Sequence, residues 1–182
     1  MRNIRRIVIH CTSGWGNQST DSIKAYWINE LGWKQVGYHK LIGLDGTIEN
    51  LAPLSAVTNG VAGFNSDSVH ICFKGGLLDI QVDKKGKQKH IYGDTRTEQQ
   101  KAAIAYAISD VFFQLRELGV KDIDDITVVG HRDLSPDTNK SGFIEPPEYI
   151  KVCPTFNAIE EYGLKMCGDR AIERMKKGRK YY

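Results

Sequence analysis

Long apolar runs are missing from this sequence of 182 residues. None approaches the roughly 18 residues that a membrane-spanning helix needs. The first six residues lead straight into a short apolar strand, where a signal peptide would continue into an apolar core. Internal repeats and low-complexity linkers are also absent. We therefore expect a protein made in the cytoplasm without a signal peptide, and one that does not span a membrane.

Cysteine is scarce as well. The four cysteines stand at positions 11, 72, 153 and 167 without regular spacing, and no CxxC pair occurs. This pattern predicts neither a disulfide framework nor a zinc finger. We expect reduced thiols, with Cys11 and Cys72 as packing residues inside strands.

The composition is that of an ordinary globular chain, 41% hydrophobic and 26% charged, which predicts one domain with one core. Strand-like and helix-like patterns alternate along it. This order indicates an α/β fold, a single domain in which helices pack on a mixed central β-sheet. We expect strands at 6–10, 37–42, 47–49, 68–73 and 126–131, an exposed excursion at 83–93, and helices at 22–31, 97–119 and 155–166.

Two histidines follow buried strands. His10 closes the apolar run that begins at Arg6, and His131 closes the run that begins at Ile126. If the two strands are parallel neighbours, both imidazoles reach the same edge of the sheet, where open α/β sheets place their ligands. Cys153 would add a thiolate. Two imidazoles and one thiolate suit zinc with one coordination position left for water, so we predict a zinc hydrolase.

Other interpretations of these residues stay open at this point. A lone histidine at the end of a strand is more often a hydrogen-bonded core residue than a ligand. Cys153 could be a nucleophile with His131 as its base, if Pro154 opens a helix that lowers the pKa of the thiol. The domain could also bind its target without cleaving it, or act as a regulatory protein.

Six short blocks of the sequence, taken together and in this order, form a specific pattern. The blocks are Ile9-His10-Cys11-Thr12, Val36-Gly37-Tyr38-His39, Leu44-Asp45-Gly46-Thr47, Asp67 to Cys72 with Gly75-Gly76, Gly130-His131-Arg132-Asp133 and Lys151-Val152-Cys153-Pro154. In this order they resemble the type 2 N-acetylmuramoyl-L-alanine amidases, most of all the phage amidase-type lysozymes, which are related to the peptidoglycan recognition proteins. The resemblance covers about residues 5 to 160. It implies an α/β fold, one catalytic zinc, and hydrolysis of the amide between N-acetylmuramic acid and L-alanine in peptidoglycan. The protein would then act on the cell wall, after holin-type release.

By the same resemblance, His10, His131 and Cys153 match the zinc ligands, and Tyr38 and Lys151 match the groups that assist the chemistry. Zinc with one thiolate and two neutral imidazoles keeps a net charge of about +1, enough to acidify a bound water and polarise an amide carbonyl. Lys151 stands two residues before Cys153, on the same side of an extended segment, and would stabilise the oxyanion. Tyr38 would orient the water or pass a proton to the leaving amine.

Three further histidines and one dipeptide complete the list of candidates. His39 faces away from Tyr38 on a strand and is expected to support the sheet. His70 is a weak candidate, and His90 is expected in solvent. Phe64 and Asn65 precede a strand and would line the substrate groove, although a turn explains them nearly as well.

The domain predicted at 1–164 contains an inserted loop, 134–150, because 21 residues separate His131 from Cys153. Within it, 137–148 fits an EF-hand calcium loop. The alternative is a polar, Pro-rich turn, and Ser141 stands where Asp or Asn is usual. The expected calcium ligands are Asp137, Asn139, Ser141, Phe143 and Glu148.

The final segment, 165–182, forms a predicted basic C-terminal tail with seven basic and two acidic residues, although the whole chain carries only +3. Such a tail could hold the protein near an anionic polymer. A solvated helical end explains the charges equally well. Nucleic acid is the less favoured partner.

Overall fold

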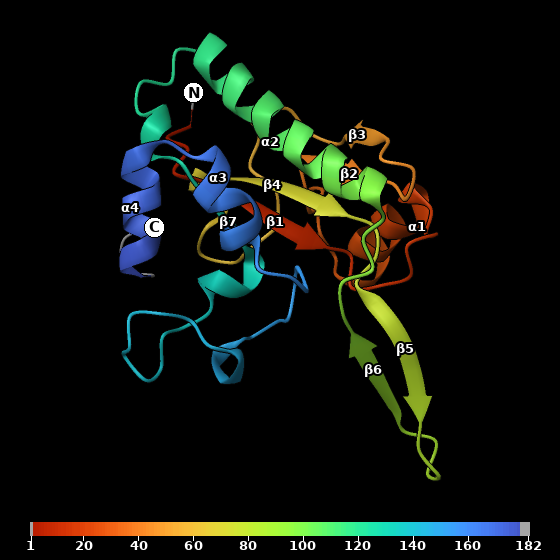
Figure 1. The fold of residues 1–182 in the computed structure, drawn as a ribbon. Coiled ribbons are helices and arrows are strands. Elements are labelled where there is room, and N and C mark those ends of the chain that lie inside the picture. The colour runs from red at the N-terminus through yellow and green to blue at the C-terminus, as the bar shows by residue number, and fades with distance from the viewer. Residues whose placement is uncertain (1, 179–182) are drawn as a thin grey trace.

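A five-stranded sheet forms the centre of the molecule (Figure 1). The structure, a computed structural model, describes residues 2–178. The strand order is β3-β2-β4-β1-β7; β1 pairs in parallel with both β4 and β7, β2 pairs in parallel with β4, and only β3 is antiparallel. The predicted mixed α/β sheet is therefore confirmed. The strands are β1 Arg6–Cys11, β2 Lys40–Ile42, β3 Ile48–Asn50, β4 Ser68–Phe73 and β7 Thr127–Gly130.

Helix α2, Glu98–Glu117, covers one face of this sheet (Figure 1). It starts with the capping box that Thr97 and Gln100 predict. In its apolar stripe, Ile104 and Ile108 are fully buried against alternate residues of β1 and β4 such as Ile9. Each such side chain contributes about 1.5–3 kcal/mol when fully buried, so this layer holds the sheet in place.

The first helical segment covers part of the opposite face. Helix α1, Thr20–Ala25, continues into a π-helical turn, η1, Tyr26–Glu30. Ile23 and Trp27 are buried, as predicted, and pack with Leu41 and Cys72. Leu31 was expected on the same face but is 41% exposed. The wider turn, in which the Leu31 N–H bonds to the Tyr26 carbonyl five residues back, rotates Leu31 away from the core.

A two-stranded hairpin projects from the body of the molecule (Figure 1). It consists of β5, Leu77–Val82, and β6, Gln88–Tyr92. The exposed segment expected at 83–93 is thus the tip and second strand of a longer hairpin. His90 is exposed, as predicted. The turn before β3 is also confirmed, since Gly46 has a φ of +83° between two antiparallel strands.

The last helix is broken rather than continuous. A π-helical turn, η6 Ile159–Gly163, runs into α3, Leu164–Met166, and α4, Asp169–Lys177, follows after a break. The helix expected at 155–166 therefore starts four residues later. The remaining elements are the 3₁₀ turns η2 Asn65–Asp67, η3 Ile123–Asp125, η4 His131–Leu134 and η5 Pro146–Glu148.

Helix α4 of the predicted basic tail extends to Lys177 and packs on the body. Ala171 and Met175 are buried, and Arg170 and Arg174 lie 3.1 and 3.3 Å from carboxylate oxygens of Asp125. The boundary at 164/165 and the anionic partner stay predictions, and 179–182 lie outside the described residues. Within the described part of the chain, no helix combines the length and apolar character that a bilayer crossing requires.

Candidate metal centre and substrate groove

The two strand-end histidines meet because their strands are parallel neighbours. Ile9 lies opposite Gly130 in the β1–β7 ladder, so the next residue of each strand, His10 and His131, leaves the same edge of the sheet. The two imidazole rings are 5.0 Å apart between centroids. Together with Cys153 they form a group that could hold a metal ion, and it is the one such group among the described residues. Its ligand atoms all lie within 4.8 Å of one another. The predicted convergence is confirmed.

Backbone contacts bring Cys153 back to this edge from the far end of the inserted loop. The Cys11 N–H donates to Cys153 Sγ at 3.1 Å, and the Arg132 N–H donates to the Cys153 carbonyl at 2.8 Å. Pro154 packs on Gly130, where a Cβ atom would lie 2.6 Å from Pro154 Cδ. Glycine at position 130 therefore lets the ligand segment approach the strand.

Burial keeps the histidines of this site neutral. It lowers the pKa of His10 well below its ordinary value, with help from the nearby His131, and it lowers the pKa of His131 to about 4. Neutral imidazole is the form that binds a metal. Burial also raises the pKa of Cys153 well above its ordinary value, so a metal that binds here displaces a proton from the thiol. The donor set fits zinc with one position open.

The alternative role of Cys153 as an activated nucleophile finds no support in this arrangement. Its side chain is buried, and a reactive thiolate requires a lowered pKa rather than a raised one. Pro154 opens no helix, since the next helical residues are those of η6. The imidazole nitrogen that contacts Cys153 Sγ is Nδ1 of His10, at 3.8 Å, whereas the nucleophile hypothesis named His131 as the base.

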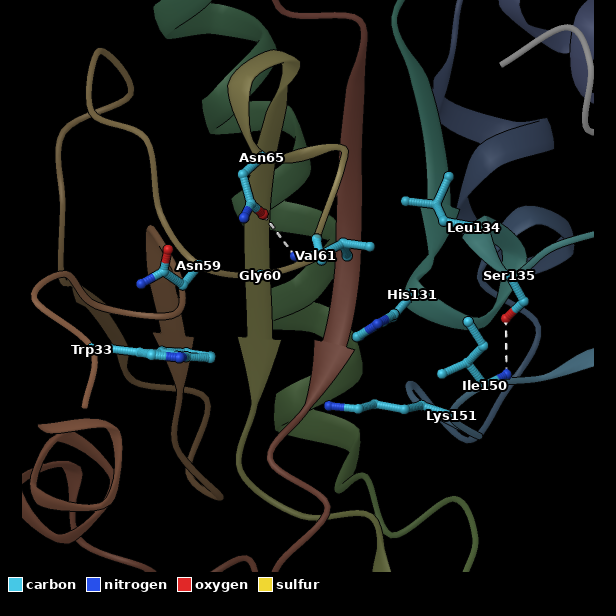
Figure 2. A pocket seen from close by; sticks show the side chains of 11 residues that line it. Trp33, Asn59, Gly60, Val61, Asn65, His131, Leu134, Ser135, Ile150 and Lys151 are labelled. Atoms are coloured by element: carbon cyan, nitrogen blue, oxygen red, sulfur yellow. Dashed lines mark hydrogen bonds between the residues drawn. The ribbon is translucent and has the colours of Figure 1, made fainter. Parts of the chain in front are cut away.

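The two predicted assisting residues lie beside the ligands. The Tyr38 ring is 5.0 Å from the ring of His10 and stands edge-on to Trp27 at 5.4 Å. Burial raises the pKa of Tyr38 well above its ordinary value. Lys151 is exposed and extends past His131 into an adjoining groove (Figure 2). Their placement agrees with the expectation, and their catalytic roles stay predictions.

This groove has a volume of about 420 Å³. In Figure 2, Trp33 stands on one side, His131 and Lys151 on the other, and the segment from Asn59 lies between them. Lys151 is held at the rim because Ser135 Oγ accepts the N–H of Ile150 at 3.1 Å. The lining residues are Trp33, Asn59, Gly60, Val61, Ala62, Asn65, His131, Leu134, Ser135, Ile150 and Lys151.

Of the two predicted groove residues, Asn65 lines this space and Phe64 does not. The Phe64 ring lies 5.1 Å from the guanidinium carbon of Arg6 instead. Sequence reasoning missed Trp33, Asn59 and Ser135. Each belongs to a different loop, and no local pattern links the three positions.

A row of histidines continues from the metal centre beneath the groove. His10 Nε2 lies 3.0 Å from His70 Nδ1, and the backbone N–H of His70 donates to His39 Nδ1 at 3.0 Å. All three rings are fully buried. His39 supports the sheet, as expected, and burial lowers its pKa to about 4. Sequence reasoning missed the contact of His70 with His10, because local sequence does not determine strand register.

The polar side chains of the inserted loop bind the loop's own backbone. Asp137 accepts from the Gly142 N–H at 2.9 Å, and Asn139 accepts from the Ser141 N–H at 2.9 Å. Glu148 accepts from the Thr138 and Asn139 N–H groups, and these bonds help lower its pKa to about 2, although the Glu145 N–H contributes most. The calcium site stays a prediction without support from this arrangement. Phe143, a predicted carbonyl ligand, is 51% exposed.

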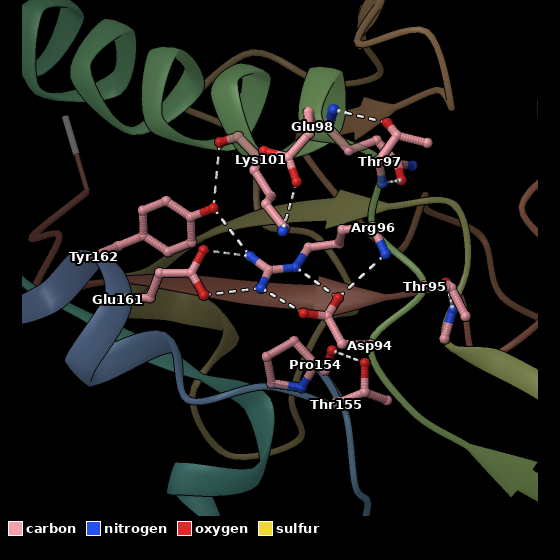
Figure 3. A network of polar contacts seen from close by, with 12 residues as sticks. Asp94, Thr95, Arg96, Thr97, Glu98, Lys101, Pro154, Thr155, Glu161 and Tyr162 are labelled. Carbon is pink, nitrogen blue, oxygen red and sulfur yellow. Dashed lines mark hydrogen bonds and ion pairs between the residues drawn. The ribbon is translucent and has the colours of Figure 1, made fainter.

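An arginine ties the segment after Cys153 to the start of α2 (Figure 3). The Arg96 guanidinium donates to Asp94 and to both carboxylate oxygens of Glu161, each at 2.8 Å. Its guanidinium carbon lies 3.3 Å from the centroid of the Phe156 ring, and it donates to Tyr162 Oη at 3.0 Å. The chain that follows the third ligand is therefore anchored three residues beyond it.

Comparison with known proteins agrees with this site. A family model described as N-acetylmuramoyl-L-alanine amidase matches residues 1–142. The endolysin of Enterobacteria phage K11 is 30% identical over 150 residues, which cover 82% of this chain and 79% of that protein. The matched stretch of the model includes His10, Tyr38 and His131, whereas Lys151 and Cys153 lie beyond it.

Solved structures share the fold. The N-acetylmuramoyl-L-alanine amidase LysC from Clostridium intestinale aligns with a TM-score of 0.55 and 23% identity over 88% of this chain and 82% of its own. A point mutant of Drosophila PGRP-LB in complex with tracheal cytotoxin aligns with a TM-score of 0.60 and 18% identity over 88% of this chain and 80% of its own. The family model, the endolysin and the converging ligand trio agree: this chain belongs to the N-acetylmuramoyl-L-alanine amidase family.

Proposed function

We propose that this protein degrades the cell wall by zinc-dependent hydrolysis of the amide bond between N-acetylmuramic acid and L-alanine. The family supports the amidase activity. The observation that carries the zinc dependence is the convergence of His10, His131 and Cys153, from three distant parts of the chain, at one edge of the sheet. Each donor is in contact with another, and a groove opens beside them.

A zinc ion held by these three side chains would supply a Lewis acid that polarises the amide carbonyl and lowers the pKa of water. The protein residues would do the rest. His10 and His131, kept neutral by burial, hold their lone pairs ready for the metal. Cys153 gives up its proton and contributes the one negative charge of the site.

Lys151 and Tyr38 would assist different parts of the reaction. The Lys151 ammonium, at the rim of the groove beside His131 (Figure 2), would stabilise the negative oxygen that develops when the amide carbonyl is attacked. The hydroxyl of Tyr38, whose ring lies 5.0 Å from the ring of His10, would orient the attacking water or pass a proton to the leaving amine. These roles need no large movement, because both residues already flank the ligands.

The groove would bind the muramyl peptide. Asn59 and Asn65 offer side-chain amides that can bond to a peptide backbone, and Trp33 offers a flat apolar wall. The fold is shared with PGRP-LB, which was solved with tracheal cytotoxin, and the K11 relative is named an endolysin. We infer that the target is peptidoglycan, reached after holin-type release.

Calcium binding by 137–148 is a separate proposal. Polar side chains at loop positions 1, 3 and 5 turn into the loop, but Glu148 would have to exchange its bonds to the Thr138 and Asn139 N–H groups for the ion. Calorimetry with calcium tests this proposal. If calcium produces no heat of binding and no shift of the melting temperature, the proposal is wrong.

The zinc proposal is tested by metal analysis together with wall digestion. We expect purified protein to carry one zinc per chain and to release free peptide from peptidoglycan, whereas Cys153→Ala loses both properties. Cys167→Ala is the matched control, since Cys167 is a free cysteine away from the ligand group. A chelator should abolish activity and added zinc restore it.

Three outcomes would contradict the proposal. The first is activity that survives complete removal of zinc, as expected for a cysteine nucleophile. The second is a Cys153→Ala variant that still releases peptide. The third is wild-type protein that binds peptidoglycan and releases nothing, which would identify a binding or regulatory protein.

A further inference from the structure

The ligand His10 has a second ring nitrogen, and a neighbouring side chain meets it. His10 Nδ1 is turned towards Cys153 Sγ, at 3.8 Å. Its other nitrogen, Nε2, lies 3.0 Å from Nδ1 of His70. Both rings are fully buried, with their planes inclined at 61°. The metal-facing side and the opposite side of the His10 ring are therefore both fixed by contacts.

The fold holds the His70 ring in this place from three directions. Val8 pairs with His70 across the β1–β4 ladder, so His70 lies diagonally beside His10 on the same face of the sheet. The His39 ring stacks on it at 5.9 Å and accepts its backbone N–H. Gly60 makes room for it, since a Cβ atom there would lie 2.3 Å from His70 Nδ1.

Packing alone does not explain a histidine here. His70 Nε2 is buried and has no hydrogen-bond partner among residues 2–178, an arrangement that destabilises a folded protein. An apolar side chain of similar size would fill the same space without this loss. The polar contact that the His70 ring makes is the one to His10, so the gain must come from that contact.

We propose that His70 is a positioning residue for the metal ligand His10, an inference that rests on the proposed zinc function. His70 Nδ1 accepts the Nε2–H of His10, which fixes the His10 tautomer whose Nδ1 lone pair points at the metal. His70 keeps its own proton on Nε2. Ligand histidines are commonly oriented by such a partner, often a carboxylate or a carbonyl. An imidazole acceptor performs the same task without adding charge to the site.

The test measures zinc affinity of the metal-free protein by competition with a chromophoric chelator. We expect His70→Leu to weaken zinc binding by about 10- to 100-fold, the range found for such outer partners. His70→Asn should recover part of the loss, because its Oδ1 can replace Nδ1 as the acceptor. His90→Leu, in the exposed hairpin, is the matched control and should bind zinc like the wild type.

A second readout separates positioning from a merely structural role. In urea unfolding of the metal-free protein, His70→Leu should be at least as stable as the wild type, since it removes the unpartnered Nε2–H. A structural histidine would instead lower stability and leave the zinc affinity of the folded fraction unchanged, and that result would overturn the inference. Zinc binding by His70→Leu within threefold of the wild type would overturn it as well.

Nitrogen-15 NMR of the zinc-loaded wild type decides the matter even if the leucine variant fails to fold. We expect His10 to bind zinc through Nδ1 and carry its proton on Nε2, and the reverse assignment would overturn the inference. Wild-type protein without stoichiometric zinc would overturn the proposed function and this inference together. Equal zinc affinity in wild type and His70→Leu would overturn this inference alone.

Discussion

At the scale of single residues, the candidate centre depends on two glycines as much as on its ligands. Gly130 allows Pro154, and with it Cys153, to approach the end of β7, and Gly60 leaves space for the ring of His70. Both positions need the absence of a side chain rather than unusual backbone angles. Close approach of neighbouring segments is what brings His10, His131 and Cys153, far apart in sequence, to within 4.8 Å of one another.

Lys151 is the residue whose removal should separate chemistry from metal binding. We predict that Lys151→Met lowers kcat by about 100- to 1,000-fold, the effect of losing one oxyanion-stabilising donor. The zinc content should not change, because Lys151 is exposed and is not a ligand. Steady-state peptide release and metal analysis on the same preparation check both statements.

Lys89→Met, in the β5–β6 hairpin, serves as the control of equal charge loss. If Lys151→Met retains wild-type kcat, or if it loses zinc, the oxyanion role is wrong.

At the scale of elements, one network joins the helical layer to the ligand segment. Arg96 precedes α2, whereas Glu161 and Tyr162 follow Cys153 and accept hydrogen bonds from its guanidinium (Figure 3). The ring of Phe156 packs on the same guanidinium. The hydrogen bond from Arg96 holds the pKa of Asp94 below its ordinary value. The position of the third ligand is therefore coupled to the start of the longest helix.

We predict that Arg96→Met lowers the free energy of unfolding by about 2–4 kcal/mol, because it breaks a buried, bidentate ion pair and leaves carboxylates facing an apolar side chain. Lys101→Met removes a more exposed ion pair with Glu98 in the same region and should have a much smaller effect, because exposed ion pairs add little to stability. Urea titration of both variants measures the difference. Equal stability of the two would show that the network is dispensable.

At the scale of the whole molecule, the face of the sheet opposite α2 buries several histidines beside its apolar clusters. His10, His39 and His70 lie in it without exposure, and His131 adjoins it. The pKa values of His39 and His131 are both about 4, and burial is the largest cause of each shift. Unfolding returns these rings to a pKa of about 6.5.

The metal-free protein should therefore lose stability as the pH falls from about 6.5 to about 4, because the unfolded chain binds protons that the folded chain excludes. Each histidine adds about 1.4 kcal/mol per pH unit to this slope. Asp133 has the opposite effect on stability, since burial raises its pKa to about 6 and the folded chain therefore binds its proton more readily. Its effect on the slope cancels that of about one histidine. Urea unfolding at several pH values measures the slope, and constant stability over this range would refute it.

The sequence by itself determined the local features. Apolar runs of four or five residues located β1, β4 and β7, the Thr97 capping box located the start of α2, and the histidines after two of those runs indicated ligands. These features follow from neighbours within a few positions, which a chain shows directly. The same patterns could not predict the π-helical turn that exposes Leu31, because the extra residue in that turn does not change the spacing of apolar residues in the sequence.

Only the tertiary structure decided which residues meet. The groove takes Trp33, Asn59 and Ser135 from three loops, and the contact of His70 with His10 depends on the register of β4 against β1. Strand register and loop closure result from the packing of the whole core on both faces of the sheet. That packing sums contacts between distant residues, so no local stretch of sequence contains it.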